Sequence, residues 1–145
     1  MTPERFLSKL RESIAKLNYI SLSVEDNQPC PQFEIRSSLK GTAIIKGYYC
    51  ELGDSFIQIS HSGREEFTNN DESAATFLSL IEDIVRLLAV NGFTEKQWLD
   101  PNGQVKRSLV ELPLSGRRQV YRLGKRPKFL QGRLKLTEHK FPPLS

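Results

Sequence analysis

The chain opens with apolar residues at helical spacing, namely Phe6, Leu7, Leu10, Ile14 and Leu17. Residues three or four positions apart share one face of a helix. Thr2 can accept a backbone N–H at the N-cap, and Pro3 suits the first helical position. We therefore expect an amphipathic helix between Thr2 and Asn18 with one face toward a core.

Between residues 19 and 69 the apolar positions change to a period of two. Ile20, Leu22 and Val24 alternate with polar residues, as in a strand with one buried face. Turn signals follow at 40–41, 52–55 and 61–64. Because short turns join antiparallel strands, we expect a meander of four or five strands.

A second and longer helix is expected to end at Asn91-Gly92, with Asn70 or Asp71 as its cap. Its apolar positions are Ala74, Phe77, Leu78, Ile81, Ile84, Val85 and Leu88, widened by Leu80, Leu87 and Val90. So wide an apolar face can cover a sheet and contact a second partner. Either the first helix or a second copy of the chain fits that role.

The remaining residues are divided by glycine and proline into short extended pieces. Asp100-Pro101-Asn102-Gly103 matches a type I turn followed by a left-handed glycine, so residues 96–99 should pair with 104–112. Residues 119–123 and 133–137 are further extended pieces, and 141–143 are expected to be a frayed end. The fold class is thus α+β: an N-terminal helix, an antiparallel β-meander of four to five strands, a long second helix, and a basic β-hairpin or extended C-terminal segment.

The formal charge of +4 is an average over two unlike parts of a 145-residue chain, which has the length of one domain. Residues 1–103 hold 10 Lys/Arg and 15 Asp/Glu, a charge of −5. Residues 104–145 hold 11 Lys/Arg and two Glu, a charge of +9. We expect an acidic α+β body at 1–103 and a basic β-rich extension at 104–145 of the same single domain.

Targeting and redox signals point to a cytoplasmic protein. The most apolar window, 77–90, contains three charged residues, so no membrane span is expected. The first 17 residues lack the apolar stretch of a signal peptide. Cys30 and Cys50 can form one disulfide, but two free thiols are the favoured interpretation.

Motifs for catalysis are weak, and we expect no enzyme, no metal and no cofactor. Gly53-Asp54-Ser55 is read as a hairpin turn, since Ile57 stands where a nucleophile elbow has glycine. Glu138-His139-Lys140 has the E-x-K spacing of metal-dependent nucleases, but it is better explained as a charged tail. A metal-dependent nuclease stays open as an alternative.

The basic segment gives the strongest functional signal. Its candidate nucleic-acid contacts are Arg117, Arg118, Arg122, Lys125, Arg126, Lys128, Arg133 and Lys135, with Tyr121 and Phe129 interleaved. Cations release condensed counterions when they meet a phosphate backbone, and aromatic rings can stack on unpaired bases. Trp98 can flank the same surface.

These observations favour a non-enzymatic binding protein whose basic C-terminal surface contacts the backbone of DNA or RNA. The alternative is a protein–protein interaction module, of the adaptor, chaperone or toxin-neutralising type, that binds an acidic protein. A basic edge hairpin that only resists aggregation also fits. The asymmetry of charge further allows the segment to dock on the acidic body or to contact a second copy in a homodimer.

Overall fold

The protein is represented by a computed structural model that describes residues 1–26, 29–59, 64–68, 71–114, 117–123 and 134–145. The first part of the chain forms α1 (Pro3–Ala15), β1 (Ile20–Glu25), β2 (Gln32–Ser37), β3 (Ile45–Tyr48), β4 (Asp54–Ile59), β5 (Arg64–Thr68) and α2 (Asp71–Asn91). The second part forms β6 (Phe93–Leu99), β7 (Val105–Leu114), β8 (Arg117–Leu123) and β9 (Lys135–Phe141). This order confirms the α+β fold that the sequence predicts.

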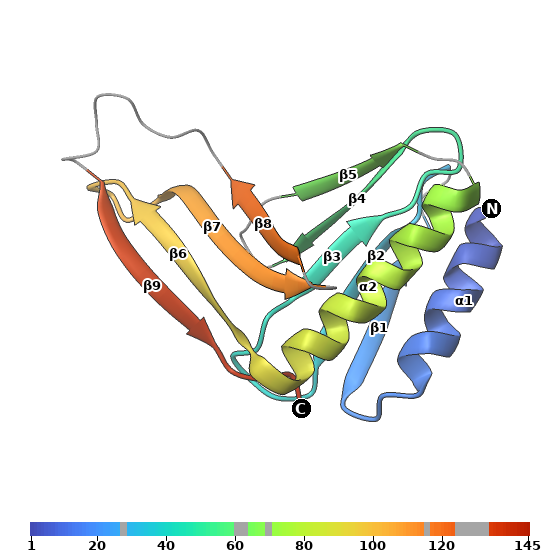
Figure 1. The fold of residues 1–145 in the computed structure, drawn as a ribbon, viewed down its shortest axis with the longest axis horizontal. Coiled ribbons are helices and arrows are strands. Elements are labelled where there is room, and N and C mark those ends of the chain that lie inside the picture. The colour runs from blue at the N-terminus through green and yellow to red at the C-terminus, as the bar shows by residue number, and fades with distance from the viewer. Residues whose placement is uncertain (27–28, 60–63, 69–70, 115–116, 124–133) are drawn as a thin grey trace.

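The first sheet is an antiparallel meander in the order β1-β2-β3-β4-β5. Each strand pairs with the one that precedes it, for example Leu22 with Ile35 and Ile35 with Ile45. Figure 1 shows α1 and α2 side by side on one face of this sheet. The other face carries exposed polar side chains such as Ser23, Gln32 and Lys46.

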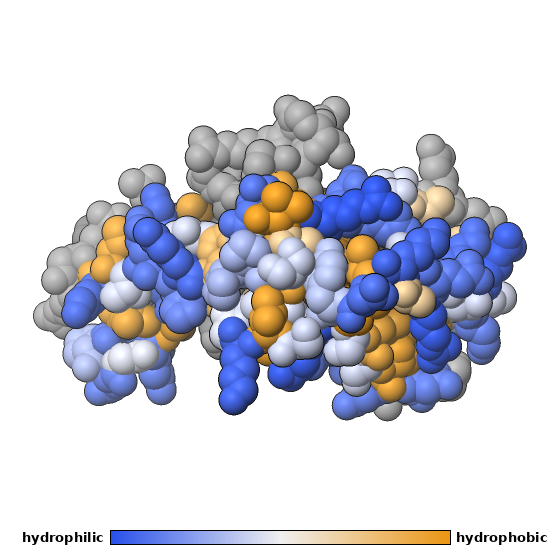
Figure 2. Space-filling model, turned by 90° about the horizontal axis from the view of Figure 1, so that it is seen from below, coloured by the Kyte–Doolittle hydropathy of each residue, from blue (hydrophilic) through white to orange (hydrophobic). Residues whose placement is uncertain are grey.

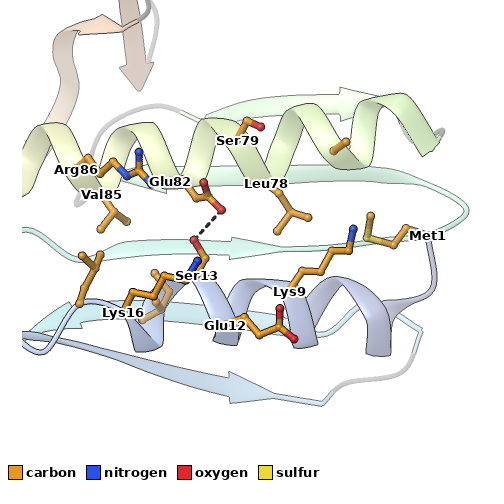
Figure 3. A pocket seen from close by; sticks show the side chains of 13 residues that line it. Met1, Lys9, Glu12, Ser13, Lys16, Leu78, Ser79, Glu82, Val85 and Arg86 are labelled. Carbon is orange, nitrogen blue, oxygen red and sulfur yellow. Dashed lines mark hydrogen bonds between the residues drawn. The ribbon is translucent and has the colours of Figure 1, made fainter.

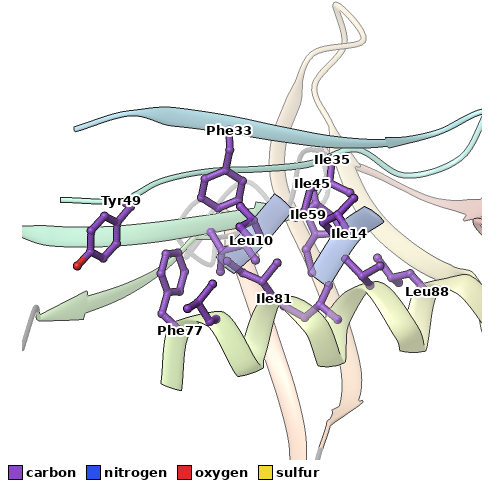
Figure 4. Close-up of a cluster of buried hydrophobic side chains, with 14 of the residues drawn as sticks. Leu10, Ile14, Phe33, Ile35, Ile45, Tyr49, Ile59, Phe77, Ile81 and Leu88 are labelled. Carbon is purple, nitrogen blue, oxygen red and sulfur yellow. The ribbon is translucent and has the colours of Figure 1, made fainter. Parts of the chain in front are cut away.

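The main hydrophobic core lies between this sheet and the two helices (Figure 4). Phe6 of α1 stacks on Tyr49 with ring centroids 4.1 Å apart and on Phe77 of α2 at 5.6 Å. Ile81 of α2 is fully buried. The wide apolar face of α2 therefore packs on the sheet and also contacts α1, which is one of the two partners that the sequence allowed.

The ends of both helices follow their sequence signals. The Thr2 hydroxyl accepts a hydrogen bond from the Arg5 amide at 3.3 Å, and Pro3 begins α1. Gly92 ends α2 in the left-handed region, with φ 60°, and its amide donates to the Leu88 carbonyl. A side chain at Gly92 would meet the Phe141 carbonyl oxygen at 2.3 Å, so glycine is required there for two reasons.

The second sheet is also antiparallel and has the strand order β8-β7-β6-β9. The turn between β6 and β7 forms as predicted: Gly103 has φ 80°, and its amide donates to the Asp100 carbonyl. Lys96 pairs with Leu109, so residues 96–99 and 104–112 do form a hairpin. In Figure 1, β8 lies next to β5 of the first sheet, and β9 is at the far edge.

The C-terminal residues pack onto the core, which corrects the expectation of a frayed end at 141–143. Phe141 stacks on Phe93 with ring centroids 4.5 Å apart, and the Leu144 side chain is only 2% exposed. The Leu144 amide donates to the Leu88 carbonyl, and the Ser37 hydroxyl donates to the Leu144 carbonyl. The local sequence shows two prolines after Phe141. It does not predict the burial of Leu144 or these long-range hydrogen bonds.

Cys30 and Cys50 form a disulfide, so the interpretation as two free thiols is wrong. The cause is the register of β2 and β3. Gln32 pairs with Tyr48, and the Tyr49 amide donates to the Pro31 carbonyl just beyond. One more step along the two chains sets Cys30 opposite Cys50, with their Cα atoms 4.6 Å apart, within the range that a disulfide requires.

Within the described residues, no helix has the length and apolar character needed to cross a membrane. The face seen in Figure 2 is largely hydrophilic, and its hydrophobic side chains form separate patches.

Candidate functional site

In the described part of the chain, the predicted basic residues lie on the two opposite edge strands of the second sheet. Arg117, Arg118, Tyr121 and Arg122 belong to β8 at one edge, and Lys135 begins β9 at the other. Lys125, Arg126, Lys128, Phe129 and Arg133 lie outside the described residues. The central strands β7 and β6 lie between these edges, so any surface joining β8 to β9 must include their residues.

Strand alternation gives the second sheet a covered face and an outer face. On β6, Glu95 is fully buried and Thr94 and Lys96 are exposed. On β7, Ser108 is fully buried while its neighbour Arg107 is half-buried. We call the outer face the side of the sheet on which Lys96 and Arg107 lie.

Trp98 lies on the outer face, on an interior strand and near the β6–β7 turn. It pairs with Arg107 on β7 and with Leu136 on β9. The Arg107 guanidinium carbon is 4.7 Å from the centroid of the indole ring, which is the geometry of a cation–π contact. Leu136 is 51% exposed, so this row of three side chains reaches the solvent.

Three described cations belong to the outer face: Arg107 is part of this row, and Lys96 and Lys140 lie farther along β6 and β9. Lys96 on β6 and Lys140 on β9 are exposed, and Arg107 is half-buried. Glu138, which pairs with Lys96, is the single carboxylate among the described side chains of this face. Three cations against one anion make the described part of the outer face positive.

Alternation also divides the predicted contacts on β8. Arg122 pairs with Leu109 and thus holds a position on the outer face, and Arg118, four residues earlier, shares that side. Arg117 and Tyr121 hold the alternate positions, with Tyr121 paired to Val110. The sequence-based set treated all of these residues as one surface, whereas the register assigns them to two faces.

The described residues of the covered face include polar side chains on β6, β7 and β9. The Gln97 amide donates to the Glu95 carboxylate at 2.6 Å, and Gln97 pairs with Ser108 on one side and Thr137 on the other. His139 pairs with Glu95, and its ring lies 4.4 Å from that of Phe141. In the Glu138-His139-Lys140 tripeptide, His139 therefore takes the opposite side from Glu138 and Lys140. Across the described part of the chain, no three His, Cys, Asp or Glu residues gather as a metal site.

Hollows also lie elsewhere on the molecule, and two of them carry charged side chains from neighbouring elements. A groove of about 440 Å³ between α1 and α2 is bridged by the Ser13 hydroxyl, which donates to Glu82 at 2.7 Å (Figure 3). Lys9, Lys16 and Arg86 also line it, and in Figure 3 the charges of both signs alternate along its length.

The second hollow, about 510 Å³, lies on the outer face of the first sheet beside Tyr48 and Phe56, whose rings meet edge to face at 4.0 Å. Glu34 in this hollow contacts Arg36 and Lys46. Its hydrogen bond to Arg36, with the charges of both cations, lowers the pKa of the Glu34 carboxyl below its ordinary value. In this hollow the Glu34 carboxylate is thus paired with cations of its own sheet.

Sequence reasoning missed Lys96 and gave Trp98 only a flanking role. Both precede residue 104, so they were counted with the acidic body. The signal that locates them was nevertheless available, since the predicted turn at 100–103 pairs 96–99 with 104–112 and brings Trp98 beside the basic segment.

Comparisons with protein-family models, with curated proteins and with solved structures return no match.

Proposed function

We propose that the protein is a non-enzymatic binding protein that holds a nucleic-acid backbone against the outer face of its second sheet. The observation that supports this most is the gathering of Lys96, Arg107 and Lys140 on one face from three different strands. Arg118 and Arg122 hold positions on the same face of a fourth strand, and Glu111 of β7 also holds a position there, so cations still outnumber carboxylates. Cations spread over a surface match the repeated phosphates of a polynucleotide and release its condensed counterions.

The outward position of this face fits the proposal. A face whose residues do not pack in the main core can carry Lys and Arg without burying their charge. Arg107 has in addition the planar guanidinium that binds phosphate through two hydrogen bonds.

The proposal is tested by fluorescence anisotropy with labelled oligonucleotides at increasing salt. The wild-type affinity should fall steeply with salt concentration, because each neutralised phosphate releases counterions. Replacing Lys96→Gln together with Arg107→Gln should weaken binding and reduce the slope of log affinity against log salt by about 2.

The matched control is Lys9→Gln with Arg11→Gln, which removes the same charge from exposed positions of α1. This variant should keep the wild-type slope. Equal losses in the two double variants would overturn the assignment to the second sheet. Absence of salt-dependent binding in the wild type would overturn the function.

Cytoplasmic residence stays a proposal, and the disulfide now weighs against it, because structural disulfides are rare in reducing compartments. Thiol titration of the protein taken from its native cells tests the point. Reactive Cys30 and Cys50 would support a cytoplasmic protein, and blocked cysteines would contradict it.

A further inference from the structure

We propose that the bound nucleic acid is single-stranded and that Trp98 is the platform on which an unpaired base stacks. This inference rests on the proposed function and names the substrate class of the same face. The observations that carry it are the place of Trp98 on an interior strand, its contact with Arg107, and the width of the sheet.

Trp98 lies on an interior strand and not on an edge. β6 has β7 on one side and β9 on the other, and both neighbours contribute outward side chains next to the ring. The indole is half-buried, which fixes its orientation while part of its surface stays accessible. An aromatic ring held in this way offers stacking area to a base without a large loss of side-chain entropy.

The Arg107 guanidinium already occupies the position over the ring, 4.7 Å from its centroid. This contact shows that the indole presents a π face to a flat cationic group there. A base that stacks on Trp98 would replace the guanidinium, which would then be free to pair with a phosphate oxygen of the same nucleotide chain. The pair therefore supplies both contacts that single-stranded binding needs, a π surface and a backbone cation.

A regular duplex does not fit the same face. The outer axes of four strands are about 14 Å apart, whereas the major groove of B-DNA is about 12 Å wide and admits a helix or a two-stranded ribbon. Bases in a duplex are stacked on one another, so only their edges are offered. A duplex would reach the cations on this face but would offer no unpaired base to the indole.

Trp98 is the single tryptophan of the chain, so intrinsic fluorescence reports on this site alone. The intact, oxidised protein is titrated with oligo(dT), oligo(U) and a DNA duplex, each of about 12 nucleotides per strand, a length within the usual range of binding sites. Both single strands should quench the fluorescence in a saturable way. The duplex should not quench it when anisotropy shows equal occupancy.

Substitution gives a second measurement. Trp98→Leu should lower the affinity for oligo(dT) by roughly 5- to 150-fold, the range that one stacked base contributes. Trp98→Phe should recover most of that loss, because a ring remains. The control is Tyr48→Leu, which removes a half-buried aromatic ring from the outer face of the first sheet and should leave the affinity unchanged.

The outcomes separate this inference from the proposed function. Single strands that bind without quenching, or a Trp98→Leu variant with wild-type affinity, would overturn the stacking role and leave backbone binding in place. A duplex that binds as tightly and quenches as strongly would overturn the single-stranded substrate. If polyglutamate binds and no polynucleotide does, both proposals fail in favour of an acidic protein partner. If Trp98→Leu fails to fold, the fluorescence quenching of the wild type and the affinity of Trp98→Phe still test the stacking role of Trp98.

Discussion

The two antiparallel sheets of this protein differ in the side chains that they bury. On the first sheet, Phe33, Ile35, Ile45, Ile57 and Ile59 are all at most 3% exposed and pack under the two helices. On the second sheet, Glu95 and Ser108 are fully buried, among the residues whose burial the structure describes. Within those residues, the first sheet buries a row of large apolar side chains, and the second buries polar ones in the middle of β6 and β7.

This difference indicates that the two sheets have different roles in stability and binding. The first sheet and the helices supply most of the hydrophobic stabilisation. The second sheet reaches that core mainly through Phe93, Phe141 and Leu144 near its ends. Its middle can therefore carry charged and aromatic residues outward, which is where the proposed binding face lies.

The largest expected effect breaks the core of the first region. Ile81→Ala removes a fully buried side chain of α2 and should lower the free energy of unfolding by about 2–5 kcal/mol. Leu136→Ala, which truncates a 51% exposed side chain of the second sheet, should change it by about 0.5 kcal/mol. Urea unfolding measures both, and similar losses would show that the two regions do not differ as described.

Removal of the disulfide should come next in size. Cys30→Ala with Cys50→Ala opens a link between residues 20 positions apart and should lower the free energy of unfolding by about 3 kcal/mol. Because the link lies in the first region, affinity for oligonucleotides measured under conditions where the variant is folded should not change. A parallel loss of affinity would contradict the assignment of binding to the second sheet.

The junction between the regions can be tested through two glycines. Gly103→Ala must accept φ 80° in open space, and should lose about 1 kcal/mol of stability. Gly92→Ala must accept φ 60° and also push against the Phe141 carbonyl, so it should lose about 2–3 kcal/mol. The difference between the two variants, measured by thermal unfolding, reports the close approach of β9 to the end of α2. Equal losses would mean that this contact contributes nothing.

The smallest expected effect concerns the ion cluster on the first sheet. Because Arg36 and Lys46 lower the pKa of Glu34, the folded state binds fewer protons there than the unfolded state. The contribution is complete above the ordinary pKa of 4.5 and is lost as the pH falls through the lower pKa of the folded protein. Glu34→Gln should remove about 0.2–1 kcal/mol at neutral pH. The loss should vanish in acid, and a loss that persists there would contradict the electrostatic origin.

Much of the fold was predictable because its signals are local. Apolar spacing located α1 and α2, and the turn at Asp100–Gly103 gave the β6–β7 hairpin. The candidate site was predictable only in part. Arg118 and Arg122 were named from charge, but the roles of Lys96 and of Trp98 on an interior strand depend on which strands are neighbours.

The sequence by itself determined the elements, their order and the contrast between an acidic first part and a basic last part. These features depend on residues that are close in the chain, or on composition. The tertiary structure decided that Cys30 meets Cys50, that Leu144 is buried beside α2, and that β6 and β7 lie between the two predicted basic strands. Each of these depends on pairing between distant segments, and a pattern of spacing along one chain carries no record of which segments become neighbours.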